Sequence, residues 1–150
     1  MAVCQGVLLL TWGCDRFRTA GADLYPPLGD PKAIQQIEKK IHMALPKDVA
    51  LVAESDGGGR DPQYKFYLWV LYSQSGFSLT PTGVSSVRRP SHKADEALVA
   101  DLIRPYLPRG RLPQATGAIG ADWETSGLEF RANVLKSRNG EFLYVEQIRS

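Results

Sequence analysis

Cysteine and histidine are nearly absent from this chain of 150 residues. Its two cysteines are Cys4 and Cys14, and its two histidines are His42 and His92. With so few of the ligands that zinc prefers, a zinc site would require several carboxylates to converge. We therefore expect no metal site and no cofactor, and we interpret both histidines as surface residues.

The chain also lacks a large excess of charge of either sign. Its 18 lysines and arginines face 16 aspartates and glutamates, which gives a formal net charge of +2. Dedicated nucleic-acid binders carry a strong basic excess, so we expect no nucleic-acid partner. No apolar run reaches the roughly 18 residues of an ordinary membrane span. The length and the 43% of hydrophobic residues are those of one globular domain.

Motifs that would identify an enzyme are missing as well. The chain has no Gly-x-Ser-x-Gly nucleophile elbow. The glycines at 57–59 are not followed by the Lys-Ser/Thr pair of a phosphate-binding loop. We therefore favour a protein without catalytic activity. The rival interpretation is a small hydrolase that uses carboxylates around Glu54 and Asp56.

The first 14 residues differ from the rest because they carry no charge. The apolar stretch from Val7 to Trp12 has the size of a short secretory h-region. It ends in Leu10-Thr11-Trp12-Gly13-Cys14, which resembles the lipobox of bacterial lipoprotein precursors. The resemblance implies a signal peptide over residues 1–13, lipidation of Cys14, and a membrane-anchored protein of the bacterial envelope that faces the periplasm.

An alternative remains open for the same segment. Val7 to Trp12 also has the length and composition of a buried first strand, which would make the protein a cytoplasmic domain. The residues from Asp15 to Gly29 are rich in proline and glycine and show no hydrophobic periodicity, as in a tether. We therefore divide the chain into a signal peptide over 1–13, a tether over 14–29 and a single domain over 30–150.

The domain shows two helical patterns and five strand patterns. Asp30-Pro31 is a helix start, and the apolar stripe behind it predicts a helix over 31–45. A second helix is predicted over 92–104. Strands are predicted over 48–54, 64–72, 119–123, 128–134 and 141–148, with turns at Ser126-Gly127 and Asn139-Gly140. The fold class is therefore α+β: an antiparallel sheet of about five strands, in the order α-β-β-α-β-β-β, with both helices on one face.

Candidate binding residues gather on the strand over 64–72 and on the loop before it. Tyr67 and Trp69 share one face of that strand, and the loop contributes Asp56, Arg60 and Asp61. Farther along the chain, Glu129 and Arg131 share a strand face, where we expect them to form an ion pair. We expect the domain to bind another protein, as assembly factors, inhibitors and immunity proteins among small lipoproteins do. The sequence leaves the oligomeric state open.

Overall fold

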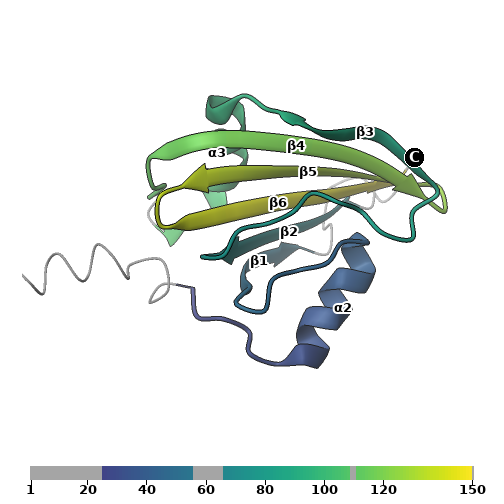
Figure 1. The fold of residues 1–150 in the computed structure, drawn as a ribbon, viewed down its shortest axis with the longest axis horizontal. Coiled ribbons are helices and arrows are strands. Elements are labelled where there is room, and N and C mark those ends of the chain that lie inside the picture. Colours follow the sequence, from purple (N-terminus) through teal and green to yellow (C-terminus); the bar gives the residue numbers. More distant parts are fainter. Residues whose placement is uncertain (1–24, 56–65, 109–110, 150) are drawn as a thin grey trace, which may run out of the picture.

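The computed structural model describes residues 25–55, 66–108 and 111–149, which form a six-stranded antiparallel sheet and two α-helices (Figure 1). The α+β class predicted from the sequence is confirmed. Across the sheet the strands lie in the order β1-β2-β6-β5-β4-β3. The elements are α2 (Pro31–Ile41), β1 (Ala50–Ser55), β2 (Phe66–Ser73), β3 (Ser86–Lys93), α3 (Glu96–Ile103), the 3-10 turn η1 (Arg104–Tyr106), β4 (Ala115–Thr125), β5 (Leu128–Ser137) and β6 (Gly140–Arg149).

The strand that the sequence did not predict is β3, so the expected count of about five strands is corrected to six. β3 is an edge strand that pairs only with β4, and nearly all of its residues are exposed. It contains Pro90 and two irregularities in its register, features that discourage pairing with another chain. Because β3 is exposed on both faces, its sequence has no alternation of apolar and polar residues, and this alternation is the pattern that predicts a strand. The helix expected to begin at His92 begins instead at Glu96, capped by Asp95.

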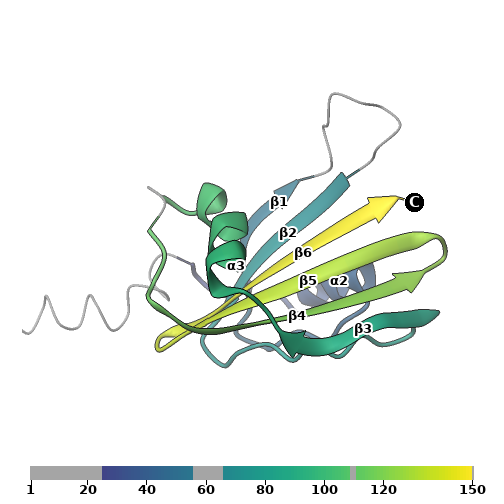
Figure 2. The same ribbon diagram turned by 90° about the horizontal axis from the view of Figure 1, so that it is seen from above.

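The two helices lie on opposite faces of the sheet, which corrects the prediction of one shared face (Figures 1 and 2). Consecutive side chains of β2 belong to different cores, because strand residues alternate between faces. Trp69 packs in the core under α2, with Ile37 and Ile41. Leu68 packs in the other core, under α3. The prediction that this strand is covered on both sides is confirmed. Helix α2 covers the face that contains Trp69, and α3 covers the face that contains Leu68.

Helix α2 begins as predicted and ends four residues early. The Asp30 carboxylate accepts a hydrogen bond from the Lys32 backbone amide, with Pro31 in the first turn. The helix ends at Ile41 because His42 adopts a left-handed conformation, with φ of 58°. Met43 then turns away to form a bridge with Pro81.

Two tight hairpins join the last three strands. Ser126 and Gly127 both have positive φ and connect β4 to β5, as a type I′ turn requires. In the second hairpin Ser137 pairs with Gly140, so the loop consists of residues 138–139. The place of this turn was predicted correctly, but Asn139-Gly140 is not its central pair, because only Gly140 has positive φ and it already belongs to β6.

Candidate functional site

Helix α3 covers only one end of its side of the sheet, near the β5–β6 turn (Figure 2). On β5 this side changes from the buried Leu135 to Asn133, Arg131 and Glu129. The neighbouring strands change in the same way, and no helix of the described chain lies over these polar residues. We call them the polar face: Arg88, Arg89, His92, Gly120, Asp122, Glu124, Glu129, Arg131, Asn133 and Glu146.

A row of alternating charges crosses four strands of the polar face. Residues directly opposite one another on neighbouring strands share a face, with Cβ atoms about 5 Å apart. Asp122 on β4 is paired with both Arg89 on β3 and Arg131 on β5. Arg131 is paired in turn with Glu146 on β6. The row therefore places each charge beside the opposite charge.

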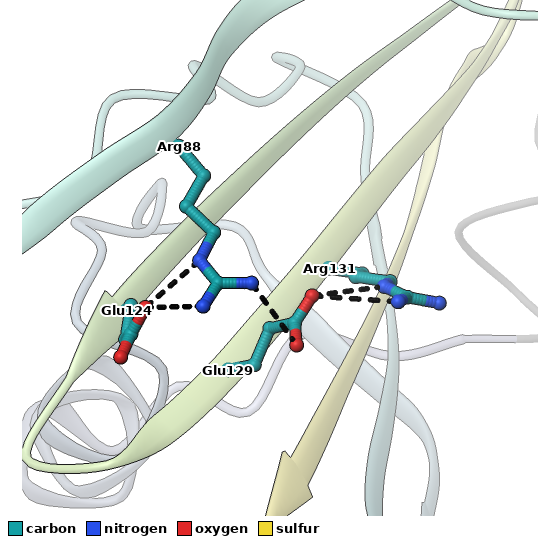
Figure 3. A network of polar contacts seen from close by, with 4 residues as sticks. All are labelled: Arg88, Glu124, Glu129 and Arg131. Atoms are coloured by element: carbon teal, nitrogen blue, oxygen red, sulfur yellow. Dashed lines mark hydrogen bonds and ion pairs between the residues drawn. The ribbon is translucent and has the colours of Figure 1, made fainter. Parts of the chain in front are cut away.

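A second row contains two carboxylates opposite each other, Glu124 and Glu129. Like charges in this position destabilise a sheet, and Arg88 from β3 reaches between them (Figure 3). Its guanidinium lies 2.7 Å from Glu124 and 3.5 Å from Glu129. The register of β3 shifts between Val87 and Arg89, and this irregularity directs Arg88 toward the polar face.

The ion pair predicted between Glu129 and Arg131 is present, at 3.4 Å. The Glu129 side chain is only 19% exposed, so Arg88 and Arg131 compensate a largely desolvated carboxylate. Arg131 reaches toward Glu129 (Figure 3), two residues earlier on β5, whereas Asn133 is two residues later on the same strand.

Glu146 holds its proton more tightly than an ordinary glutamate. Burial raises the pKa of this carboxyl, and the nearby carboxylates of Asp122 and Glu129 raise it further. Arg131 and a 3.3 Å hydrogen bond from the Tyr144 hydroxyl oppose this increase without cancelling it. The hydrogen bond between Tyr144 and Glu146 has the opposite effect on the tyrosine. The pKa of Tyr144 is raised by burial and by Glu146. The face thus contains a carboxyl suited to carry a proton.

A pocket of about 380 Å³ lies between β3, β4 and β5 on this face. Both charge signs line it, together with one imidazole and one amide. Its lining residues are Arg89, His92, Gly120, Ala121, Asp122, Glu129, Arg131 and Asn133. In the part of the chain that the structure describes, no group of three or more His, Cys, Asp or Glu side chains is placed to hold a metal ion.

Two candidate residues taken from the sequence, Tyr67 and Trp69, lie on the other side of the sheet. Tyr67 and Trp69 are stacked, with ring centroids 6.2 Å apart, and line a pocket of about 710 Å³ with Lys40, Glu54 and Gln147. Trp69 is only 2% exposed, and its indole N–H donates to Glu54 over 3.1 Å. Trp69 therefore acts mainly as a core residue.

The remaining candidates, Asp56, Arg60 and Asp61, lie outside the described residues. Sequence reasoning missed His92, Asn133 and Glu146 as members of a site, because they come from three separate strands. One signal was available. Gly120 lies inside a strand pattern, and a glycine in such a position often marks a close approach of other groups.

Comparison of the chain with protein-family models, with curated proteins and with solved structures found no match.

Proposed function

We propose that this chain is a protein-binding domain and that its partner docks on the polar face. The observation that carries the proposal is the alternating charge of Arg89, Asp122, Arg131 and Glu146 on a part of the sheet that no described helix covers. Fixed charges of both signs select a complementary partner surface and reject others. The partner would be another protein because the row of charges extends over four strands, beyond the pocket between β3, β4 and β5.

Site-specific photo-crosslinking tests this surface in cells that naturally make the protein. A benzophenone side chain in place of Arg89 is expected to give one discrete crosslinked product, whereas the same probe at the exposed Gln36 of α2 gives none. Arg131→Ala is expected to reduce the Arg89 product about fivefold, since a charge that contacts the partner contributes on the order of 1 kcal/mol.

Arg138→Ala is the matched control, because Arg138 is an exposed arginine in the β5–β6 turn, away from the polar face. Equal crosslinking from positions 89 and 36, or equal losses in the two arginine variants, would contradict docking on the polar face. The rival interpretation, a hydrolase that uses carboxylates around Glu54 and Asp56, places its site on the other side of the sheet from Glu146. The same experiment separates the two, because an enzyme for small substrates gives no discrete protein product.

We further propose that the domain is held in the bacterial envelope by a lipid on Cys14, in the assembly, inhibitor or immunity role of small lipoproteins. The support is the lipobox-like sequence that ends at Cys14. Among the described residues no helix is long and apolar enough to cross a membrane.

Radiolabelled palmitate and cell fractionation test the anchor. Wild-type protein is expected to take up label and sediment with membranes, and Cys14→Ser is expected to lose both properties because the acylated thiol is gone. Cys4→Ser provides the control and is expected to behave like wild type. Label and membrane location that survive in Cys14→Ser would contradict the anchor.

A further inference from the structure

A small notch lies above Gly120 on the polar face, where side chains from both neighbouring strands converge. Gly120 is paired with His92 on β3 and with Asn133 on β5. A Cβ atom built on Gly120 would lie 3.0 Å from Asn133 Oδ1 and 3.2 Å from His92 Nε2. Glycine therefore leaves a space that has two polar atoms at its rim.

The imidazole of His92 is held in one orientation. Its Nδ1 lies 2.9 Å from the carbonyl oxygen of Pro90. Because a carbonyl oxygen only accepts hydrogen bonds, Nδ1 carries the proton and donates it. In the neutral ring Nε2 is then an acceptor, and it faces the notch.

Both rim atoms are without a hydrogen-bond partner in the part of the chain that the structure describes. Within the described ranges, neither His92 Nε2 nor the side-chain amide of Asn133 makes a hydrogen bond. Asp122, two residues beyond Gly120 on the same face of β4, makes no ion pair there either. Arg131 is engaged with Glu129. The notch therefore offers two acceptor atoms, His92 Nε2 and Asn133 Oδ1, with the Asp122 carboxylate in the same pocket and not engaged in an ion pair with either neighbouring arginine among the described residues.

We propose that this notch binds the ammonium group of a lysine side chain that the protein partner supplies, an assignment that rests on the proposed function. An ammonium group carries three N–H donors on one compact charged atom. These donors match His92 Nε2, Asn133 Oδ1 and the Asp122 carboxylate. A guanidinium group is a wide planar fork. An anion would have no donor to offer to His92 Nε2 or Asn133 Oδ1, and it would have to bind Arg89 or Arg131 elsewhere in the pocket.

Amide-resolved NMR titration of the full chain tests the assignment. The probe is N-acetyl-lysine-N-methylamide, and the uncharged control of the same shape is N-acetyl-norleucine-N-methylamide. The lysine probe is expected to give saturable shifts at His92, Gly120 and Asn133, with a dissociation constant in the millimolar range. Norleucine and acetate are expected to leave these signals unchanged, and saturable binding of acetate instead would overturn the proposal.

Two variants and one matched control locate the binding. Gly120→Ala fills the notch without a positive-φ penalty and is expected to weaken lysine binding about tenfold, as when one or two hydrogen bonds are lost. Gly117→Ala lies on the same strand, where a Cβ would approach only Lys136 Cδ at 3.9 Å, and is expected to bind like wild type. Asn133→Asp adds a charge and is expected to bind about fivefold more tightly.

The outcomes separate this proposal from the proposed function. Equal binding by Gly120→Ala and Gly117→Ala, or weaker binding by Asn133→Asp, would overturn the notch as the ammonium site. Tighter binding of butylamine than of the lysine probe would overturn a lysine residue as the ligand. If position 89 gives no crosslinked product while the lysine titration succeeds, the docking surface is wrong and the ammonium site stands.

Discussion

Phe130→Ala is expected to lower the free energy of unfolding by about 4 kcal/mol, the upper range for deleting a fully buried aromatic side chain. Phe130 is 0% exposed and stacks on Trp123 with ring centroids 5.8 Å apart. The ring of His42 meets it edge-on at 5.4 Å. The deletion therefore leaves a cavity between the sheet and the end of α2. Denaturant-induced unfolding followed by tryptophan fluorescence measures the loss.

Trp123→Phe is the matched control in the same aromatic stack. The indole N–H of Trp123 is buried and has no hydrogen-bond partner among the described residues. Replacement by phenylalanine removes this unsatisfied donor, which stabilises the fold, and also shrinks the ring, which weakens the packing. Because these two effects partly cancel, the loss of unfolding free energy is expected to stay below about 1.5 kcal/mol. A Phe130→Ala loss no larger than that of Trp123→Phe would show that the stack does not organise this core.

Gly140→Ala is expected to destabilise the protein by about 3 kcal/mol, through backbone strain and overpacking together. Gly140 has φ of 147°, and a Cβ there would lie 2.7 Å from Tyr72 Cζ. The Tyr72 ring has little room to withdraw, because its hydroxyl donates to the Asn139 carbonyl over 2.6 Å and its ring packs against Phe142. Thermal unfolding monitored by circular dichroism measures the change.

Gly83→Ala separates strain from collision. Gly83 also has a positive φ, of 65°, but a Cβ there would have no atom within 4 Å. Only the conformational cost remains, so a loss of about 1 kcal/mol is expected. Equal losses in the two glycine variants would mean that contact with Tyr72 contributes nothing at position 140.

Some elements of this fold can be predicted from short stretches of sequence. The cap formed by Asp30 and Pro31 places the start of α2, because both residues act on the adjacent turn. The alternation along β2 predicts burial on both faces, since strand side chains alternate regardless of what covers them. The turn at Ser126-Gly127 was also predictable, because the positive φ of these two residues depends only on the residues of the turn itself.

The polar face was only partly predictable. Alternation shows that Glu129, Arg131 and Asn133 share one face of β5, and the ion pair between Glu129 and Arg131 followed from it. It does not show that Arg89 and His92 lie beside them, because no tight turn joins β3 to β4 and the register of β3 depends on contacts between distant segments. His92 was misplaced on a helix because its own strand, β3, has no apolar alternation.

By itself, the sequence determined the elements with strong local signals: the start of α2, the two-sided burial of β2, the hairpins among the last three strands, and the α+β class. Tertiary structure alone decided that the helices lie on opposite faces, that β3 completes the sheet, and that His92, Gly120 and Asn133 meet at one notch. The reason is physical. Caps, turns and alternation act over a few residues, whereas the pairing of β3 with β4 brings distant side chains together through backbone hydrogen bonds.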